Sequence, residues 1–311
     1  MITTVTLNAA IDKTYIVPGF ALDKLYRVEQ MTATAGGKGI NVARVIHALG
    51  EEVTASGFAA GFHGQMILHK LSEEGIPADF VHVEGESRVC LNILDPWHGT
   101  QTELLEQGPA VTLTDLDAIR SKVATLAARS THIVLSGSLP QGCPPALYAE
   151  LIEIARRAGA IPILDTSGAA LEEGVKSAPA LIKPNEHEVG KLTGEGADAS
   201  EDEVMPAIRR LMASGIERVV VSLGARGALA GVRGALYRVA LPAVKAINPV
   251  GSGDSMVAGL VVADKRGLSA EDGLILGAAC GTANALMPSA GQVRLDDVES
   301  LRTQIQVERI G

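Results

Sequence analysis

The sequence predicts an α/β fold built around a mostly parallel β-sheet. Short apolar runs alternate along the chain with segments in which apolar residues recur every three or four positions. Small or polar residues follow most of these runs, as they do where the strands of an open α/β sheet end at a binding site. A chain of 311 residues suits one large α/β domain with an excursion, and no linker or repeat divides the sequence.

The apolar runs predict strands at 2–8, 54–58, 132–137, 161–166, 180–184 and 218–224. Amphipathic spacing predicts helices at 40–49, 116–128, 146–158 and 204–214, and a further helix at 256–265. The regions 15–34 and 87–106 interrupt this alternation with short strand-like patterns and with turn residues at 95–99. These two regions predict a small β excursion from the main sheet.

The composition disfavours several other classes of protein. A formal net charge of −9 with 3% aromatic residues argues against nucleic-acid binding, which needs a basic surface and stacking rings. The apolar stretch 274–287 is shorter than the about 20 residues that span a bilayer, so we expect no membrane insertion. Residues 1–7 lack a basic segment before the apolar one and predict a first strand in place of a signal peptide. Three widely spaced cysteines favour a reducing cytoplasm over a disulfide framework or a zinc site.

The strongest motif is NPVGSGDS at 248–255, which leads into the helix predicted at 256–265. Its glycines allow backbone N–H groups to approach a ligand at a helix N-terminus, where the helix dipole favours negative charge. We therefore interpret Gly251, Ser252 and Gly253 as an anion hole for a transferring phosphoryl group. Asp254 is then placed to accept a proton from an attacking hydroxyl. The alternative is a simple helix cap, which is the more common role of an isolated Gly-x-Gly-Asp.

A second polar motif, KPNEHE at 183–188, ends a predicted strand and opens a helix. Asn185 and Glu188 lie three residues apart, so both can face one helical turn and order water around Mg²⁺. The same spacing is equally typical of a capping box. Asp165 is a further candidate acceptor in that water network, although an Asp at a strand end is more often a turn former.

Two glycine-rich segments predict contacts with ligands. At 222–228, glycines after a buried-looking strand would let a nucleotide lie on the backbone, although a tight hairpin turn has the same pattern. At 35–41, backbone amides, Lys38 and Asn41 meet at the start of a helix, which suits a polyhydroxylated anion. This segment lacks the spacing of a Walker loop, and Val42 replaces the third glycine of a dinucleotide fingerprint.

The predicted β excursion contributes two candidate phosphate ligands, Arg88 and Arg27. A guanidinium group matches a phosphate as a fork of donors, whereas an arginine on a strand is otherwise usually a solvated charge.

Taken together and in this order, the segments 36–42, 136–140, 183–188 and 251–254 resemble the ribokinase-like (PfkB) family of sugar kinases over the whole chain. Within that family, 6–8 with Asp12, 102–109 and 222–228 are most similar to the branch of tagatose-6-phosphate kinases and 1-phosphofructokinases. The segments 248–254 and 304–307 are closer to the tagatose-6-phosphate kinases.

The resemblance implies a three-layer α/β sandwich with a mostly parallel central sheet and a small β-sheet lid. One kinase domain would span 1–311, with the lid formed by about 12–35 and 87–107. It also implies Mg²⁺ as cofactor and ATP as co-substrate in the cytoplasm, with a monovalent cation as a further candidate. The implied site residues are catalytic Asp254 with Gly251, Ser252 and Gly253; Asp12, Gly37, Lys38, Asn41 and Arg88 for the sugar phosphate; Lys183, Ser222, Gly224, Gly227 and Asn284 for ATP; and Asn185 and Glu188 for the metal through water.

We therefore expect ATP-dependent phosphorylation of a ketohexose phosphate to a bisphosphate, with tagatose 6-phosphate as the first candidate. The alternatives are fructose 1-phosphate, then fructose 6-phosphate, or a non-catalytic sensor of sugar phosphates. Some phosphofructokinases of the family carry an Asn soon after the lid arginine and a second arginine further on. Val89, Cys90 and Glu103 stand here instead, which disfavours fructose 6-phosphate. Exposed lid edges would either pair two chains as a homodimer or be protected within one chain.

Overall fold

Within the residues that the structure describes, the main sheet has 10 strands in the order β14-β13-β12-β11-β10-β9-β8-β1-β4-β5. The structure is a computed structural model that describes residues 1–193 and 201–311. Neighbouring strands from β11 to β5 are parallel: β11 (Arg218–Ser222), β10 (Leu181–Ile182), β9 (Ile161–Asp165), β8 (His132–Ser136), β1 (Ile2–Thr6), β4 (Val53–Ala60) and β5 (Val81–Val83). An antiparallel extension completes one edge with β12 (Ala228–Val232), β13 (Ala235–Ala240) and β14 (Gln306–Arg309). The predicted mostly parallel sheet is confirmed.

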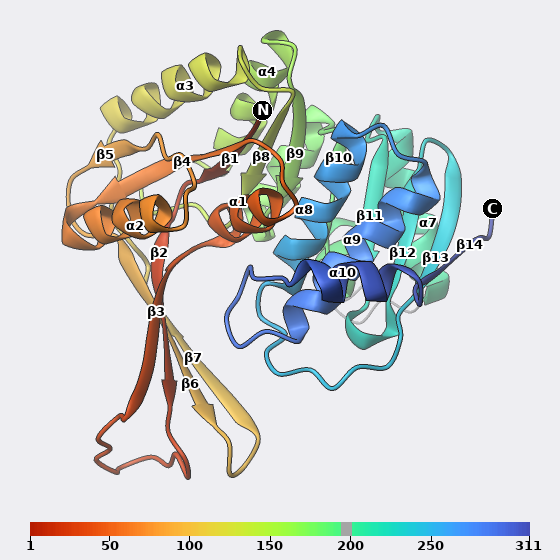
Figure 1. Cartoon of the computed structure of the whole chain (residues 1–311). Helices are drawn as coiled ribbons and strands as arrows, with labels where there is room; N and C mark the ends of the chain where they lie inside the picture. The colour runs from red at the N-terminus through yellow and green to blue at the C-terminus, as the bar shows by residue number, and fades with distance from the viewer. Residues whose placement is uncertain (194–200) are drawn as a thin grey trace.

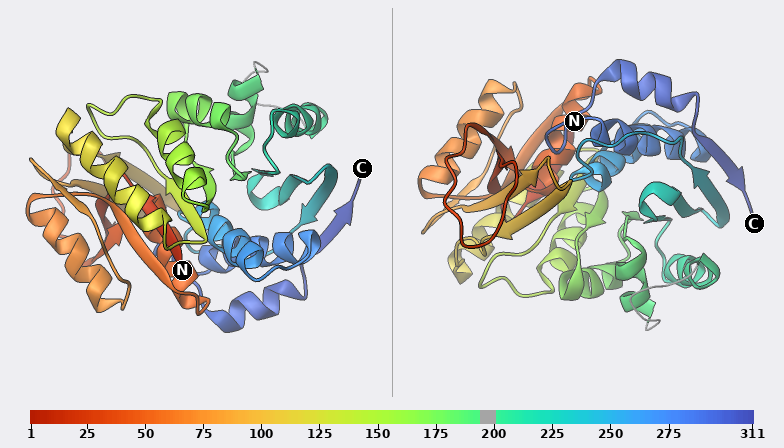
Figure 2. Two further views of the ribbon diagram at one scale, coloured as in Figure 1. Left: turned by 90° about the horizontal axis from the view of Figure 1, so that it is seen from above. Right: turned by 90° about the horizontal axis from the view of Figure 1, so that it is seen from below.

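Helices cover both faces of this sheet and give three layers (Figures 1 and 2). One face carries α1 (Lys38–Ala48), α2 (Gly61–Glu73), α8 (Ser252–Lys265), α9 (Ala270–Ala285) and α10 (Leu295–Arg302). The other carries α3 (Leu113–Ala127), α4 (Leu147–Arg157), α5 (Gly168–Gly174), α6 (Glu186–Thr193) and α7 (Glu201–Ala213).

Each face of the sheet has its own hydrophobic core, because successive side chains of a strand point to opposite sides. In β11, Val220 packs in the core beneath α8 and α9, whereas Val219 and Val221 pack in the core beneath α4 and α7. A strand buried on both faces is therefore continuously apolar, which is why the parallel strands are visible in the sequence.

A separate 4-stranded sheet projects from the main body, at the lower left of Figure 1. Its order is β3-β2-β6-β7, with β2 (Ala10–Ile16), β3 (Gln30–Gly36), β6 (Arg88–Asp95) and β7 (Thr100–Leu105). We call it the small sheet. Strands β6 and β7 lie in the region 87–106 and most of β3 lies in 15–34, where the sequence predicted a β excursion, whereas β2 begins before the predicted region. Strand β3 runs through Gly36 and Gly37 directly into α1.

The predicted elements are present with shifts of a few residues at their ends. The helix predicted to open at 183–188 is α6, whereas the sequence analysis did not identify β5, the antiparallel strands β12–β14, or helices α2, α5, α9 and α10. The apolar stretch 274–287 lies largely in α9, whose residues pack against α8 in the core. None of the helices in the described part of the chain has the length and apolar character needed to cross a membrane.

Candidate active site

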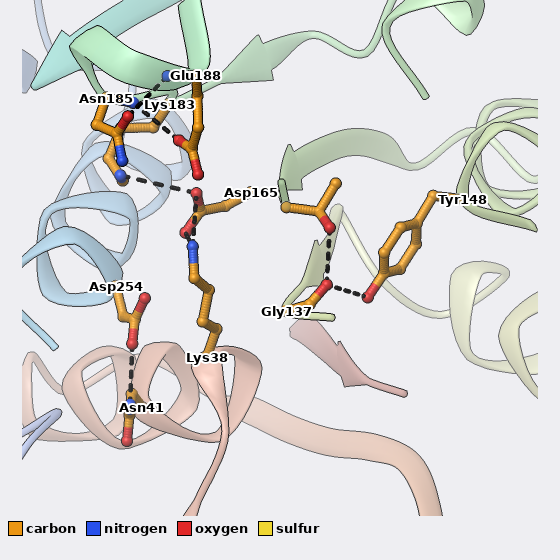
Figure 3. Close-up of polar contacts among 10 residues, drawn as sticks. Lys38, Asn41, Gly137, Tyr148, Asp165, Lys183, Asn185, Glu188 and Asp254 are labelled. Carbon is orange, nitrogen blue, oxygen red and sulfur yellow. Dashed lines mark hydrogen bonds and ion pairs between the residues drawn. The ribbon is translucent and has the colours of Figure 1, made fainter. Parts of the chain in front are cut away.

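Most of the predicted site residues meet at one edge of the main sheet, where the parallel strands end and the helices α1 and α8 begin (Figure 3). Asp165 ends β9, and Lys183 and Asn185 follow β10. Lys38 opens α1 and Asp254 lies in the first turn of α8. This is where an α/β sheet binds its ligands, because loops diverge there and helix N-termini point inward.

Asp254 is buried, with 7% of its surface exposed. The Nδ2 of Asn41 donates a hydrogen bond to its Oδ2 over 2.9 Å (Figure 3). Burial raises the pKa of Asp254 above the usual carboxyl range, while the ammonium group of Lys38 opposes that rise. A raised pKa makes the carboxylate a better proton acceptor, which suits a general base.

Two lysines share the carboxylate of Asp165, which is 1% exposed. The Nζ of Lys38 lies 3.4 Å from its Oδ1, and the Nζ of Lys183 lies 3.7 Å from the same atom. Burial works to raise the pKa of Asp165, but the ammonium groups of Lys183 and Lys38 outweigh it and lower that pKa. The carboxylate raises the pKa of Lys38 in turn. Lys38 is therefore held cationic beside Asp254, and the pair of lysine side chains around Asp165 suits a site for phosphate oxygens.

The glycines before Asp254 shape the start of α8. Gly251 has φ 84°, a left-handed conformation that favours glycine, and a Cβ there would lie 2.8 Å from the backbone nitrogen of Gly291. A Cβ at Gly253 would lie 3.0 Å from the Nζ of Lys183. The backbone of 251–253 therefore lies close to a lysine ammonium with no side chain between them, as an anion hole requires.

Asn284 stabilises the loop that leads into α8. Its side chain is fully buried, its Nδ2 donates to the Val250 carbonyl over 2.8 Å, and its Oδ1 accepts from the Gly291 N–H over 2.7 Å. It does not line the cavity that opens beside Gly253. Its expected place beside a nucleotide base stays a prediction, and its contacts show that it braces the loop.

A cavity of about 570 Å³ opens beside Gly253. Its lining includes Ser222, Gly224 and Gly227 from the β11–β12 connection, and Gly281 and Thr282 from α9. The segment 222–228 is thus both the reversal between two antiparallel strands and one wall of a cavity. Its apolar and backbone-rich lining suits a purine and ribose.

Asp12 and Arg88 lie at the base of the small sheet, where β2 and β6 run side by side. Burial raises the pKa of Asp12 to about 6, although the guanidinium groups of Arg88 and Arg44 oppose the rise. The Nε of Arg88 donates to the Asn8 carbonyl over 3.0 Å. Gly36 pairs with Ala10, two residues from Asp12 on β2, and a Cβ at Gly36 would lie only 2.1 Å from the Asp12 Cγ, so any larger residue there would displace the Asp12 carboxylate.

Two other residues predicted to contact the sugar phosphate, Gly37 and Arg27, differ in where the structure places them. Gly37, with φ 108°, joins β3 to α1 and leaves the start of the helix open. Arg27 is exposed in the loop between β2 and β3, beyond the pair Ile16 and Gln30 that ends the hairpin far from Asp12. The structure therefore does not bring Arg27 to the other site residues of its own chain.

Comparison with known proteins assigns the chain to a family. A model of the pfkB family of carbohydrate kinases matches residues 5–295. The chain belongs to this family. The tagatose-6-phosphate kinase of Staphylococcus epidermidis is 38% identical over 309 residues, which cover 99% of each chain.

Solved structures of the same fold agree with this assignment. Phosphofructokinase-2 from Escherichia coli, solved in complex with potassium, has a TM-score of 0.92 at 30% identity, covering 97% of this chain and 98% of that one. A Thermotoga maritima protein described as a possible 1-phosphofructokinase has a TM-score of 0.89 at 26% identity, covering 100% and 99%. The predicted ribokinase-like fold is confirmed, and the chain is an ATP-dependent carbohydrate kinase.

In this kinase, Asn185 and Glu188 are joined by two reciprocal hydrogen bonds. The backbone N–H of Asn185 donates to the Glu188 Oε2 over 2.9 Å, and the N–H of Glu188 donates to the Asn185 Oδ1 over 2.8 Å. This is the capping box that was the alternative to a metal role. Figure 3 shows the Glu188 carboxylate on the side facing Asp165, so both roles suit one geometry. Family members use ATP with a divalent metal.

Tyr148 and Thr166 are site residues that the sequence analysis missed. The Tyr148 hydroxyl and the Thr166 Oγ1 both donate to the Gly137 carbonyl, over 3.0 and 2.8 Å (Figure 3). A Cβ at Gly137 would lie 3.7 Å from the Cβ of Lys38. The two hydroxyls therefore fix the loop that lies against Lys38. Nothing in the spacing of these residues along the chain indicates that they share a partner.

A larger cavity, of about 690 Å³, lies at the opposite edge of the main sheet, where β9, β10 and β11 begin. Its arginines already have protein partners: Arg218 lies 2.6 Å from Asp264, and Arg156 donates to the carbonyls of Ser177 and Ala178. These arginines are therefore already paired within the protein, and the carboxyl ends of the strands remain the candidate site.

Proposed function

We propose that this kinase transfers the γ-phosphoryl group of Mg-ATP to a hydroxyl of a ketohexose phosphate, and that tagatose 6-phosphate is its substrate. One observation carries the proposal: the buried Asp254 lies at the start of α8, with the Lys38 and Asn41 side chains on one side and the cavity beside Gly253 on the other. The 38% identity to a tagatose-6-phosphate kinase over 99% of both chains supports this acceptor.

The proposed step is a direct in-line displacement. The sugar hydroxyl oxygen bonds to the γ-phosphorus, the bond from that phosphorus to the β–γ bridging oxygen breaks, and ADP leaves. Asp254 takes the hydroxyl proton. The N–H groups of 251–253 and the ammonium of Lys183 stabilise the charge on the transferred group, and they need no rearrangement because the protein already holds them in place.

The proposed metal site is the pair Asn185 and Glu188, which would hold Mg²⁺ through water. Its oxygen donors are of the type that Mg²⁺ prefers, and Mg²⁺ keeps several waters when it binds with nucleotide phosphates. The described residues contain no group of three or more His, Cys, Asp or Glu side chains placed to hold a metal ion. The ion would neutralise charge on the β- and γ-phosphates. A monovalent cation is a further proposal, by analogy with the potassium complex of Escherichia coli phosphofructokinase-2.

We propose that the acceptor binds between the small sheet and α1. Asp12 would accept hydrogen bonds from sugar hydroxyls, and Arg88 with Lys38 would bind the phosphate. The N–H groups that follow Gly37 and the amide of Asn41 complete the sugar side. The small sheet would then close over the sugar and exclude water, which strengthens these charged interactions. ATP as co-substrate and three unpaired cysteines suit the cytoplasm.

We further propose that two copies of the chain pair through their small sheets. Apolar side chains are exposed there: Met31 and Leu104 at 55% and Leu105 at 62%. Strand β7 is exposed along its whole length and forms an edge that a second copy can cover. Analytical ultracentrifugation of the wild type and of Leu105→Lys tests this, because a monomeric wild type contradicts the proposal.

A coupled assay for ADP release tests the function. We would compare tagatose 6-phosphate, fructose 1-phosphate, fructose 6-phosphate, ribose and adenosine at fixed Mg-ATP, and expect the highest kcat/KM for tagatose 6-phosphate. The second candidate, 1-phosphofructokinase, is favoured by the fit to the Thermotoga maritima structure, and it would be established by a higher kcat/KM for fructose 1-phosphate. ATP consumption that does not depend on any sugar phosphate would exclude both.

A further inference from the structure

Arg44 lies one helical turn after Asn41 in α1, and only 8% of its surface is exposed. Its NH1 nitrogen donates to the Asn41 Oδ1 over 3.2 Å. The same Asn41 side chain donates from Nδ2 to Asp254 over 2.9 Å. One amide therefore links a buried guanidinium to the carboxylate that we propose as the base.

The chemistry of these groups allows only one orientation of the Asn41 amide. A guanidinium can only donate hydrogen bonds, and a carboxylate can only accept them. With Oδ1 toward Arg44 and Nδ2 toward Asp254, both contacts are hydrogen bonds. A turn of the amide by 180° would set donor against donor and acceptor against acceptor. The position of Arg44 therefore decides that Asn41 presents a donor to the base.

The guanidinium of Arg44 is itself fixed from several directions. Its Nε and NH2 donate to the two carboxylate oxygens of Glu74, over 2.7 and 3.1 Å. NH2 also donates to the Ala35 carbonyl at the end of β3, over 2.8 Å, and NH1 to the Ala290 carbonyl, over 3.3 Å. The bidentate ion pair with Glu74 and the two carbonyl acceptors fix the orientation of the Arg44 guanidinium, so this orientation does not depend on Asn41.

We propose that Arg44 is a positioning residue for the phosphoryl transfer. By orienting the Asn41 amide it holds Oδ2 of Asp254 and leaves Oδ1 of that carboxylate for the sugar hydroxyl. This inference rests on the proposed role of Asp254 as the base. It assigns the alignment of the reacting carboxylate to a side chain that does not line the cavity beside Gly253, and a small misplacement of that carboxylate is costly.

Charged groups on several elements face Asp254 and enter any pH readout. They are Lys38 on α1, Asp165 at the end of β9, Lys183 after β10 and Asp12 on β2. The hydrogen bond from Asn41 lowers the pKa of Asp254 against the effect of burial. Loss of the oriented amide therefore raises the pKa of the base, and the acid limb of the kcat profile moves to higher pH.

The test is a double-mutant cycle on kcat between Arg44→Lys and Asn41→Ala. Lysine keeps the charge, but its three donors sit on one nitrogen, so it cannot reproduce the planar fork that reaches Glu74 and Asn41 together. In the wild-type background we expect Arg44→Lys to lower kcat by about 10- to 100-fold, with the KM for ATP changed by less than about 3-fold and the acid limb shifted upward. In the Asn41→Ala background the same substitution should have almost no further effect on kcat.

Two outcomes would overturn the proposal: the same fold-loss from Arg44→Lys in both backgrounds, or a lower melting temperature with kcat and the acid limb unchanged. Arg120→Lys is the matched control: Arg120 on the distant helix α3 bonds Asp117 of the same helix and Glu150 of α4, so this substitution should leave kcat unaltered. Near-normal turnover of Asp254→Asn would instead show that the base assignment is wrong. The cycle and the single variant therefore separate failure of this inference from failure of the proposed function.

Discussion

Replacement of Asp254 by Asn tests the proposed base with little change in shape. The Nδ2 of Asn41 can still donate to the oxygen of an Asn at position 254, so the contact now made at 2.9 Å is retained. What is lost is the capacity to take a proton. General base catalysis contributes about 10²- to 10⁴-fold, which corresponds to about 3 to 5 kcal/mol of the activation barrier.

We expect kcat of Asp254→Asn to fall by at least about 10²-fold, with the dissociation constant for Mg-ATP changed by less than about 3-fold. The assay is coupled ADP release with saturating acceptor, together with calorimetric titration of the nucleotide. In the wild type kcat should fall as pH is lowered through the pKa of Asp254, because only the deprotonated carboxylate accepts the proton. Burial raises that pKa, so the fall should begin above the ordinary carboxyl range. This acid limb should be absent from the variant.

A matched control is available at the same helical position. Asp115 lies third in α3 as Asp254 lies third in α8, but it closes an exposed capping box with Thr112. Asp115→Asn should lower the free energy of unfolding by about 1 kcal/mol and leave kcat unchanged. Near-normal turnover of Asp254→Asn, or an equal loss in both variants, would refute the assignment of the base.

Arg88→Ala should raise the KM for the sugar phosphate by about 10-fold or more and leave the KM for ATP unchanged. A change in the KM for ATP alone would contradict the proposed role of Arg88. Asp12 has a folded-state pKa of about 6 against 3.8, so the folded state binds its proton more tightly and stability declines as pH rises from about 4 to 6. Asp12→Asn should therefore raise the free energy of unfolding at pH 8 by up to about 3 kcal/mol, have little effect at pH 4, and weaken sugar binding; urea melts that show no pH dependence of the difference would contradict this. Gly251→Ala forces a Cβ to within 2.8 Å of the Gly291 nitrogen and should lower kcat by about 10-fold or more, whereas Gly234→Ala, at φ 94° with nothing within 4 Å, should lower only the melting temperature.

The parallel half of the fold was predictable because its strands are buried on both faces. Val219, Val220 and Val221 form an unbroken apolar run for that reason, and the polar residues after such runs marked the edge that holds the site. The antiparallel strands β12–β14 were not predicted. Their register is set by pairing with β11 and with one another, and β13 pairs with the C-terminal strand β14, which is distant in the sequence. Short helices such as α5 lack the length over which a period can be recognised.

Site residues could be predicted where a single short motif contains both the candidate residue and the neighbours that suggest its role. Asp254 follows two glycines, and Asn185 precedes Glu188 at capping-box spacing. What could not be predicted are partners brought together by the fold from distant positions. Asp165 lies between Lys38 and Lys183, and Arg44 contacts Ala290 across 246 positions of the chain. No local spacing encodes such pairs, because only the folded topology brings them into contact.

The continuity of β3 with α1 limits how acceptor preference can be re-engineered. The strand that flanks Asp12 and the helix that carries Lys38 are one segment joined at Gly36 and Gly37, with no intervening linker. Replacing the small sheet with that of a relative would therefore also change the orientation of the Lys38 side chain, unless the transferred segment includes Gly36 and Gly37. Chimeras cut within α1, after Arg44, keep strand, glycine joint and amide in their native relation, and are the better starting point for exchanging selectivity between kinases of this fold.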